Sequence, residues 1–139
     1  MSIFDSFNIN TSGLSLERIK LDTISTNIAN VNTTRTEEGG PYKRKEVIFE
    51  ESLKQANASG GYKSYGVKPT QIREDQENKV IYQPEHPDAD QNGYLEMPNV
   101  NLSDEMINMM STLRTYEANA SAFESSKNMM KKALEISKD

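Results

Sequence analysis

The sequence predicts an α+β fold, in which long N- and C-terminal helices pair as a coiled-coil-like α domain and a small β-rich domain is inserted between them. Two observations support this prediction. Both ends of the 139-residue chain show helical periodicity, and its middle is rich in β-prone runs and turn residues. We therefore expect an N-terminal helix over residues 1–35, a β-rich insert over 36–100 and a C-terminal helix over 101–139.

The N-terminal segment has apolar residues on two faces of its predicted helix. At about 100° per residue, one stripe falls within a single arc of the helix. This stripe consists of Leu14, Leu21, Ile24, Ile28 and Val31. Leu16 and Ile19 fall near the opposite side. A helix of this kind is buried on both sides, either between two elements of its own fold or between subunits of an assembly.

The middle segment begins with a helix break and continues with short strands. Gly39, Gly40 and Pro41 end the first helical region. KEVIFEE and KVIYQP are β-prone runs, and GVKPTQI contains a proline that suits an edge strand. The polar, glycine-rich stretch QANASGGYKSYG predicts a mobile loop over residues 55–66.

The C-terminal segment carries an apolar heptad stripe over about five heptads, interrupted by a charge only at Lys127. The stripe consists of Leu102, Met106, Met109, Leu113, Tyr116, Ala120, Phe123, Met130 and Leu134. Asn101 is placed to cap this helix, and Asp104 and Glu105 lie at the positive end of its dipole. A helix this long exceeds what a globular domain of this size needs, and it is rich in small residues and methionine. These features predict an assembly protein.

Composition restricts the function further. Lys and Arg number 16 against 21 Asp and Glu, a net charge of −5, which disfavours nucleic-acid binding. The chain has no cysteine, so disulfides, thiolate metal sites and cysteine nucleophiles are excluded. Its apolar fraction of 35% is low beside the roughly 45–50% of a typical globular domain, so we expect partners to supply part of the burial.

The first residues contain no basic segment followed by an apolar run, and no stretch approaches the roughly 20 apolar residues of a membrane span. We therefore expect no membrane insertion and, if the protein is exported, a route other than the general secretory signal.

The stretch HPDADQNGYLEMPN resembles the first half of a calcium loop. Asp88, Asp90 and the Asn-Gly pair after them fit the pattern D-x-[DN]-x-[DN]-G. The bidentate Glu of such a loop would stand at position 12, which is Asn99 here, and the surrounding prolines preclude flanking helices. We therefore interpret this stretch as a turn.

No catalytic constellation emerges from the residue types. His86 is the only histidine, and no triad or metal cluster can be assembled around it. The chain lacks the spacing of a phosphate-binding loop. Lys43, Arg44 and Lys45 are expected to form a solvated face or to contact an acidic neighbour. We expect no enzymatic activity, cofactor, metal or small-molecule substrate.

Two motifs identify the chain as similar to a known family. ISTNIANVNTTRT resembles the N-terminal motif of the rod, hook and hook–filament junction proteins of the bacterial flagellum, in which an amphipathic helix ends in N-[IL]-A-N-x-N-T. LRTYEANASAFESSKNMMKKALEI resembles their C-terminal motif, R-x-Y-E-A-N followed by a helix. Two further segments are similar to sequence segments of a proximal rod subunit in this flagellar axial family, namely TRTEEGGPYKRKEVIFE and HPDADQNGYLEMPNVNLSDEM. The resemblance covers nearly the whole chain and weakens over residues 52–64 and at Val31 and Lys127.

The resemblance implies a structural subunit of the basal-body rod, which self-assembles with other rod proteins into the hollow drive shaft that transmits motor torque to the hook. It implies that the terminal helices pair and pack around a central channel, with the β domain outside. The implied partners are other rod subunits and the chain itself. The flagellar type III export apparatus would carry the unfolded chain to the periplasm without a cleaved signal peptide, and the termini would fold on incorporation.

From the periodicity and the family motifs together, we expect one set of residues to pack between subunits. These are Leu14, Leu16, Ile19, Leu21, Ile24, Ile28, Asn30, Val31, Asn32, Leu102, Met106, Met109, Leu113, Arg114, Tyr116, Glu117, Ala118, Asn119, Ala120, Phe123, Met130 and Leu134. The alternative function is a soluble helical adaptor or export chaperone of a secretion system, which the heptad and the net acidity would also suit. Such a protein would be a cooperatively folded dimer, whereas a free rod subunit is expected to be a monomer with less helix than the pattern allows.

Overall fold

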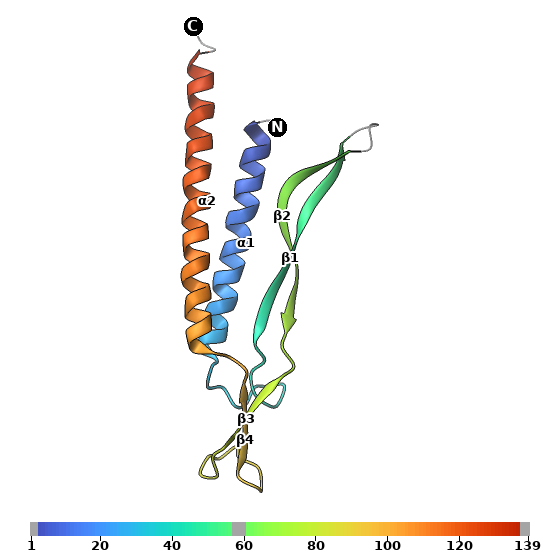
Figure 1. Ribbon diagram of the computed structural model, residues 1–139, viewed down its shortest axis with the longest axis vertical. Coiled ribbons are helices and arrows are strands. Elements are labelled where there is room, and N and C mark those ends of the chain that lie inside the picture. Colours follow the sequence, from blue (N-terminus) through green and yellow to red (C-terminus); the bar gives the residue numbers. More distant parts are fainter. Residues whose placement is uncertain (1–2, 57–60, 137–139) are drawn as a thin grey trace.

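A computed structural model describes residues 3–56 and 61–136 of the chain. Its elements in order are α1 (Ile3–Ala29), β1 (Lys45–Ala56), β2 (Gly61–Glu74), β3 (Asn78–Tyr82), β4 (Tyr94–Pro98) and α2 (Leu102–Ile136). The two helices lie side by side and run in opposite directions, with a long β1–β2 ribbon beside α1 and the β3–β4 hairpin at the far end (Figure 1). This arrangement confirms the predicted α+β fold, with a small β region inserted between paired terminal helices.

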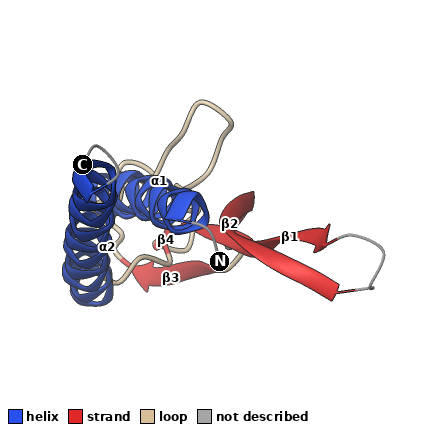
Figure 2. Cartoon of the chain, turned by 90° about the horizontal axis from the view of Figure 1, so that it is seen from above, coloured by secondary structure: helices blue, strands red, loops and turns tan. Residues whose placement is uncertain are grey.

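Helix α1 lies between α2 and the β1–β2 ribbon, as the view from above shows (Figure 2). Leu16 and Ile24 are buried, while Leu14 and Leu21 are half-buried. The two apolar faces of α1 are therefore explained within one chain: one face meets a helix and the other meets a sheet.

Helix α1 ends at Ala29, although we expected it to extend to residue 35. The side chain of Asn30 donates from Nδ2 to the carbonyl oxygen of Thr26 at 2.9 Å, and its backbone N–H bonds to the same oxygen at 3.2 Å. These bonds satisfy one of the free carbonyls that every helix C-terminus leaves. The chain then turns, with the N–H of Thr33 bonded to the carbonyl of Asn30 at 3.0 Å.

Strands β1 and β2 form a two-stranded antiparallel ribbon, from the pair Lys45–Glu74 at one end to Ala56–Gly61 at the other. Most of the loop expected over residues 55–66 is therefore strand, because cross-strand pairing satisfies backbone groups that a loop would leave to water. Residues 57–60 of that loop lie outside the described part of the chain. Pro69 lies in β2, which has a free edge, in agreement with the expected edge strand.

Gly66 fixes the ribbon onto α1. It adopts a φ of +101° at an irregularity in the pairing. A Cβ at this position would collide with Oγ of Ser12 and lie 3.2 Å from Cα of Ile9. Next to it, the N–H of Val67 donates to Oγ of Ser12 at 3.1 Å, and that hydroxyl donates to the carbonyl of Ile9 at 2.8 Å. Only glycine allows the strand to approach the helix this closely.

The stretch that resembled a calcium loop forms the turn between β3 and β4. Oδ1 of Asp90 accepts the N–H groups of Asn92 at 2.9 Å and Tyr94 at 2.7 Å, and Gly93 has a φ of +84°. Oδ2 of Asp88 instead accepts the hydroxyl of Thr34 at 2.8 Å, in the segment after α1. The two carboxylates thus hold different parts of the backbone, which agrees with the interpretation as a turn.

Helix α2 begins as the sequence predicts. The N–H of Ser103 donates to Oδ1 of Asn101 at 3.0 Å, the geometry of an N-terminal cap. Within the described residues, neither α1 nor α2 contains an apolar stretch long enough to cross a membrane.

Candidate subunit interface

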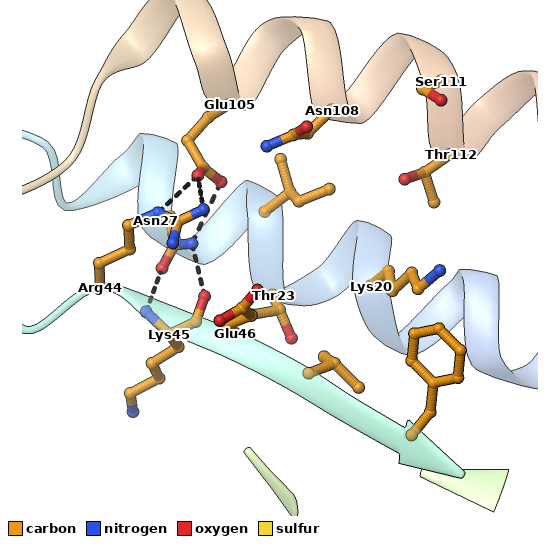
Figure 3. A pocket seen from close by; sticks show the side chains of 13 residues that line it. Lys20, Thr23, Asn27, Arg44, Lys45, Glu46, Glu105, Asn108, Ser111 and Thr112 are labelled. Atoms are coloured by element: carbon orange, nitrogen blue, oxygen red, sulfur yellow. Dashed lines mark hydrogen bonds and ion pairs between the residues drawn. The ribbon is translucent and has the colours of Figure 1, made fainter. Parts of the chain in front are cut away.

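The N-terminal helix, the β insert and the C-terminal helix meet at the side chain of Asn27, which is 1% exposed. Its Oδ1 accepts the hydroxyl of Tyr42 and the N–H of Lys45, each at 2.9 Å. Its Nδ2 donates to the carbonyl of Lys45 at 2.8 Å and to Oε2 of Glu105 at 3.1 Å (Figure 3). A side-chain amide has two donors and two acceptor sites, so its capacity is filled. Asn27 therefore joins α1 to the first residue of β1 and to the first turn of α2.

Glu105 is a carboxylate buried to 1% exposure, and Arg44 compensates its charge. Nε and Nη2 of Arg44 each lie 2.8 Å from Oε1 of Glu105. Burying a carboxylate is costly unless it is paired and hydrogen-bonded, and both conditions hold here. Among the described residues, no buried side-chain nitrogen or oxygen lacks a hydrogen-bond partner. We call Asn27, Tyr42, Arg44, Lys45 and Glu105 the junction network.

The surroundings of Tyr42 alter the acidity of its phenol. Its side chain is buried, which raises the pKa of the phenol above its ordinary value of 10.0. The carboxylates of Glu74 and Glu105 raise this pKa further. The neutral phenol, which donates to Asn27, is therefore the favoured form over a wider pH range.

From the N-terminal family motif, we expected Asn30 and Asn32, and not Asn27, to be packing residues. Asn30 caps its own helix and Asn32 is exposed, whereas Asn27, three residues after the buried Ile24, is the buried one. Asn27 occupies a position where the helical period predicts an apolar residue, and this polar exception is the feature of the sequence that could have indicated its burial.

Of the two alternatives for Lys43, Arg44 and Lys45, a contact with an acidic residue holds for Arg44, which pairs with Glu105, and for Lys45, which lies 3.6 Å from Glu74. Lys43 is exposed.

The contact between α1 and α2 is made by polar and small side chains as well as aromatic ones. Thr112 and Ser126 are buried on α2, in addition to Glu105. A Cβ on Gly13 would lie 2.9 Å from Nδ2 of Asn119, so the helices approach closely there. Near the start of α1, the rings of Phe7 and Phe123 meet edge to face with centroids 5.0 Å apart.

The predicted heptad stripe of α2 only partly faces α1. Met109, Ala120, Phe123 and Met130 are half-buried. The other members are exposed, namely Leu102 (45%), Met106 (52%), Leu113 (43%), Tyr116 (38%) and Leu134 (61%). Polar residues of α2 occupy buried positions instead, namely Glu105, Thr112 and Ser126. Packing of the heptad residues between subunits remains a prediction.

The exposed part of the stripe extends further round the helix. Met110 is 55% exposed and lies one turn after Met106. Leu102, Met106, Met110 and Leu113 form a continuous apolar row, which we call the outer stripe. It lies about a third of a turn from the buried Glu105 and Thr112. An exposed apolar row of this kind is typical of an interaction surface.

The other predicted packing residues fall into three groups. Leu16 and Ile24 are buried within the chain. A second group is half-buried, namely Leu14, Ile19, Leu21, Ile28, Asn30, Val31 and Asn119. A third group is exposed, namely Asn32, Arg114, Glu117 and Ala118. Their packing between subunits remains a prediction.

A groove of about 320 Å³ lies where α1, β1 and α2 meet (Figure 3). Lys20 lies on its wall, 3.0 Å from Glu17 and with Nζ 4.6 Å above the ring of Phe49. Among residues 3–56 and 61–136, no three His, Cys, Asp or Glu side chains gather around a common position that could hold a metal ion. The hydrogen bonds and the ion pair of the junction network hold α1, the β insert and α2 against one another, which is a structural role.

Comparison with known proteins gives two family matches and a set of full-length relatives. The family described as "Flagella basal body rod protein" matches residues 7–35, and "Flagellar basal body rod FlgEFG protein C-terminal" matches residues 91–136. The chain is 41% identical to the flagellar basal-body rod protein FlgC of Borreliella burgdorferi, over 98% of each chain. It is 38% identical to FlgC of Bacillus subtilis, over 99% of this chain and 100% of the relative. It is 36% identical to FlgC of Salmonella typhimurium, over 98% of each chain.

Proposed function

Because the chain belongs to the FlgC family of flagellar basal-body rod proteins, we propose that it builds the rod by packing the outer stripe of α2 against helices of neighbouring subunits. The chain is a structural subunit of the flagellar basal-body rod, and it assembles there with other rod components. The proposal adds that the outer stripe is the surface through which the subunit contacts its neighbours. The relatives reported above give no support to the alternative of a helical adaptor or export chaperone.

The exposure of the outer stripe is the observation that carries the proposal. Leu102, Met106, Met110 and Leu113 are between 43% and 55% exposed in the single chain. Completing the burial of an aliphatic side chain contributes about 1.5–3 kcal/mol when it starts from full exposure, so four half-exposed ones contribute several kcal/mol. Neighbouring helices in a tube would provide that burial.

The small and polar contact between α1 and α2 supports a second part of the proposal, that the helices become fully ordered on incorporation. The buried α2 positions that face α1 include Glu105, Thr112 and Ser126, whose burial yields less than that of aliphatic residues. Coupled folding of this kind is compatible with export of an unfolded chain. We propose that the flagellar type III apparatus exports the chain to the periplasm, where the assembled hollow rod transmits motor torque to the hook.

Substitution of Leu113 tests the proposal. Leu113→Asp places a charge in the outer stripe while the side chain is already 43% exposed in the single chain, so the subunit should remain soluble and fold. We expect loss of swimming and absence of the variant from purified basal bodies in cells whose own copy has been deleted. Leu113→Met, which conserves volume and apolarity, is the matched control and should swim normally. Normal swimming of the Asp variant would refute the role of the outer stripe.

A further inference from the structure

We propose that Met106 and Met110, the two methionines of the outer stripe, are oxidation sites whose sulfoxides stop the subunit from entering the assembly. The inference rests on the proposed function, since it assumes that the outer stripe packs against neighbouring subunits. It gives two of the four residues of the stripe a reactivity that Leu102 and Leu113 lack. The co-reactant is an oxidant of the hypohalous acid class.

Both thioethers are accessible in the single chain. Met106 is 52% exposed and Met110 is 55% exposed. Their spacing of four residues places them one turn apart on the same side of α2, between Leu102 and Leu113. The chain has no cysteine, which is the other sulfur-containing side chain that oxidants attack. The sulfur atoms of the outer stripe are therefore open to oxidation before neighbouring subunits cover them.

Oxidation changes what the outer stripe presents to a neighbouring subunit. The thioether sulfur gains the oxygen atom of hypochlorous acid and gives up two electrons, while the O–Cl bond breaks and chloride and a proton leave. The product is methionine sulfoxide, a polar side chain in place of a flexible apolar one. Burying a polar group without a hydrogen-bond partner weakens an association by about tenfold or more. Because sulfoxide reductases restore methionine, the block on assembly is reversible.

Met129 provides a comparison within the same helix. It is 62% exposed, so an oxidant reaches it at least as easily as Met106 and Met110. At about 100° per residue, Met129 lies about 100–140° round the helix from these two residues. Its oxidation therefore adds the same oxygen atom to α2 but leaves the outer stripe apolar.

Incorporation in the presence of an oxidant tests the inference. The natural chain is produced in cells whose own copy has been deleted, with and without a sublethal concentration of hypochlorous acid, and its amount in purified basal bodies is measured. We expect the oxidant to lower incorporation about tenfold. Met106→Leu with Met110→Leu keeps the stripe apolar and removes both sulfur atoms, so the oxidant should lower its incorporation less than about twofold. Met129→Leu is the matched control and should remain as sensitive as the natural chain.

An equal decrease for the three chains, or no decrease for the natural chain, would overturn the inference, because the sensitivity would then not come from the outer stripe. Peptide mass spectrometry of the unincorporated natural chain should find the added oxygen on Met106 and Met110. A decrease in incorporation while both residues remain unoxidised would also overturn it.

Glutamine substitutions give a result that does not depend on the oxidant. The glutamine side chain is polar and similar in length to methionine sulfoxide. Met106→Gln with Met110→Gln should lower incorporation as the oxidant does, whereas Met129→Gln should not. Equal incorporation of these two variants would contradict the inference.

Oxidation of intact basal bodies separates failure of this inference from failure of the proposed function. Met106 and Met110 should be oxidised about tenfold more slowly in basal bodies than in the purified single chain, because neighbouring subunits exclude the oxidant. Equal rates in the two preparations would show that the outer stripe is not an interface, and the proposed function would be wrong. If both residues are protected but the double leucine variant remains sensitive to the oxidant, the inference alone is wrong.

Discussion

Replacing Asn27 with alanine should open the junction between the helices and the β insert. The substitution removes the partner of Tyr42, of both backbone groups of Lys45 and of the Glu105 carboxylate. These are four hydrogen bonds in a site where water is excluded, since Asn27 is 1% exposed. At about 1 kcal/mol per bond, the cost is about 4 kcal/mol. A loss of this size is a large part of the roughly 5–15 kcal/mol that stabilises a typical domain.

Hydrogen exchange at the backbone amide of Lys45 measures this loss directly, because that N–H donates to Oδ1 of Asn27. About 4 kcal/mol corresponds to an exchange rate raised roughly 1,000-fold, at about 1.4 kcal/mol per factor of ten. Asn30→Ala is the matched control from the same motif, because the Asn30 side chain bonds only within its own turn, to Thr26 and Thr33. It should change exchange at Lys45 by less than about tenfold.

The isosteric substitution Asn27→Asp tests whether the N–H donors of Asn27 matter, because it keeps the size and shape of the side chain. It keeps the acceptor atoms but loses both N–H donors, and it places a carboxylate beside that of Glu105, now 3.1 Å from the Asn27 nitrogen. We expect at least as much loss of protection at Lys45 as for alanine. Equal exchange in the Asn27→Ala and Asn30→Ala variants, or near-natural exchange in Asn27→Asp, would refute the role given to the junction network.

Two other substitutions test further contacts. Gly66→Ala should lower the melting temperature more than Gly40→Ala. Both glycines have a positive φ, which costs alanine about 1–2 kcal/mol of strain, but only at Gly66 would the added Cβ also collide with Ser12. Equal decreases in the melting temperature would contradict the close docking of β2 on α1. Tyr42→Phe should cost about 1 kcal/mol near neutral pH, through its lost bond to Asn27. The pKa of Tyr42 in the folded chain lies above its ordinary value of 10.0, so above pH 10 the unfolded chain loses this proton first and the natural chain should lose stability. The Phe variant has no such proton and should lose less stability, which urea unfolding at several pH values measures.

The elements could be predicted from the sequence because helical and strand periodicities are local properties. The stripe from Leu102 to Leu134 gave α2, and Asn101 gave its start. The length of the ribbon could not be predicted in this way. QANASGGYKSYG is polar and contains two adjacent glycines, yet Gln55 and Ala56 pair with Tyr62 and Gly61. Pairing between strands depends on the partner strand, which local composition does not describe.

The site was predicted only in part, for a similar reason. Periodicity identifies which residues of a helix are apolar, but it does not say which partner covers them. The heptad of α2 does not indicate that Leu102, Met106 and Leu113 are exposed in the single chain while Glu105 is buried. The burial of Glu105 depends on Arg44 and Asn27, which are 61 and 78 positions away. No motif links residues at such separations.

The central claim is that the outer stripe of α2 is an interface between rod subunits. A cryo-electron microscopy map of the intact basal body that resolves side chains in the rod tests it most directly. We predict that Leu102, Met106, Met110 and Leu113 lie against helices of neighbouring subunits. A map in which this row faces open solvent, while the subunits meet through other surfaces, would contradict the claim.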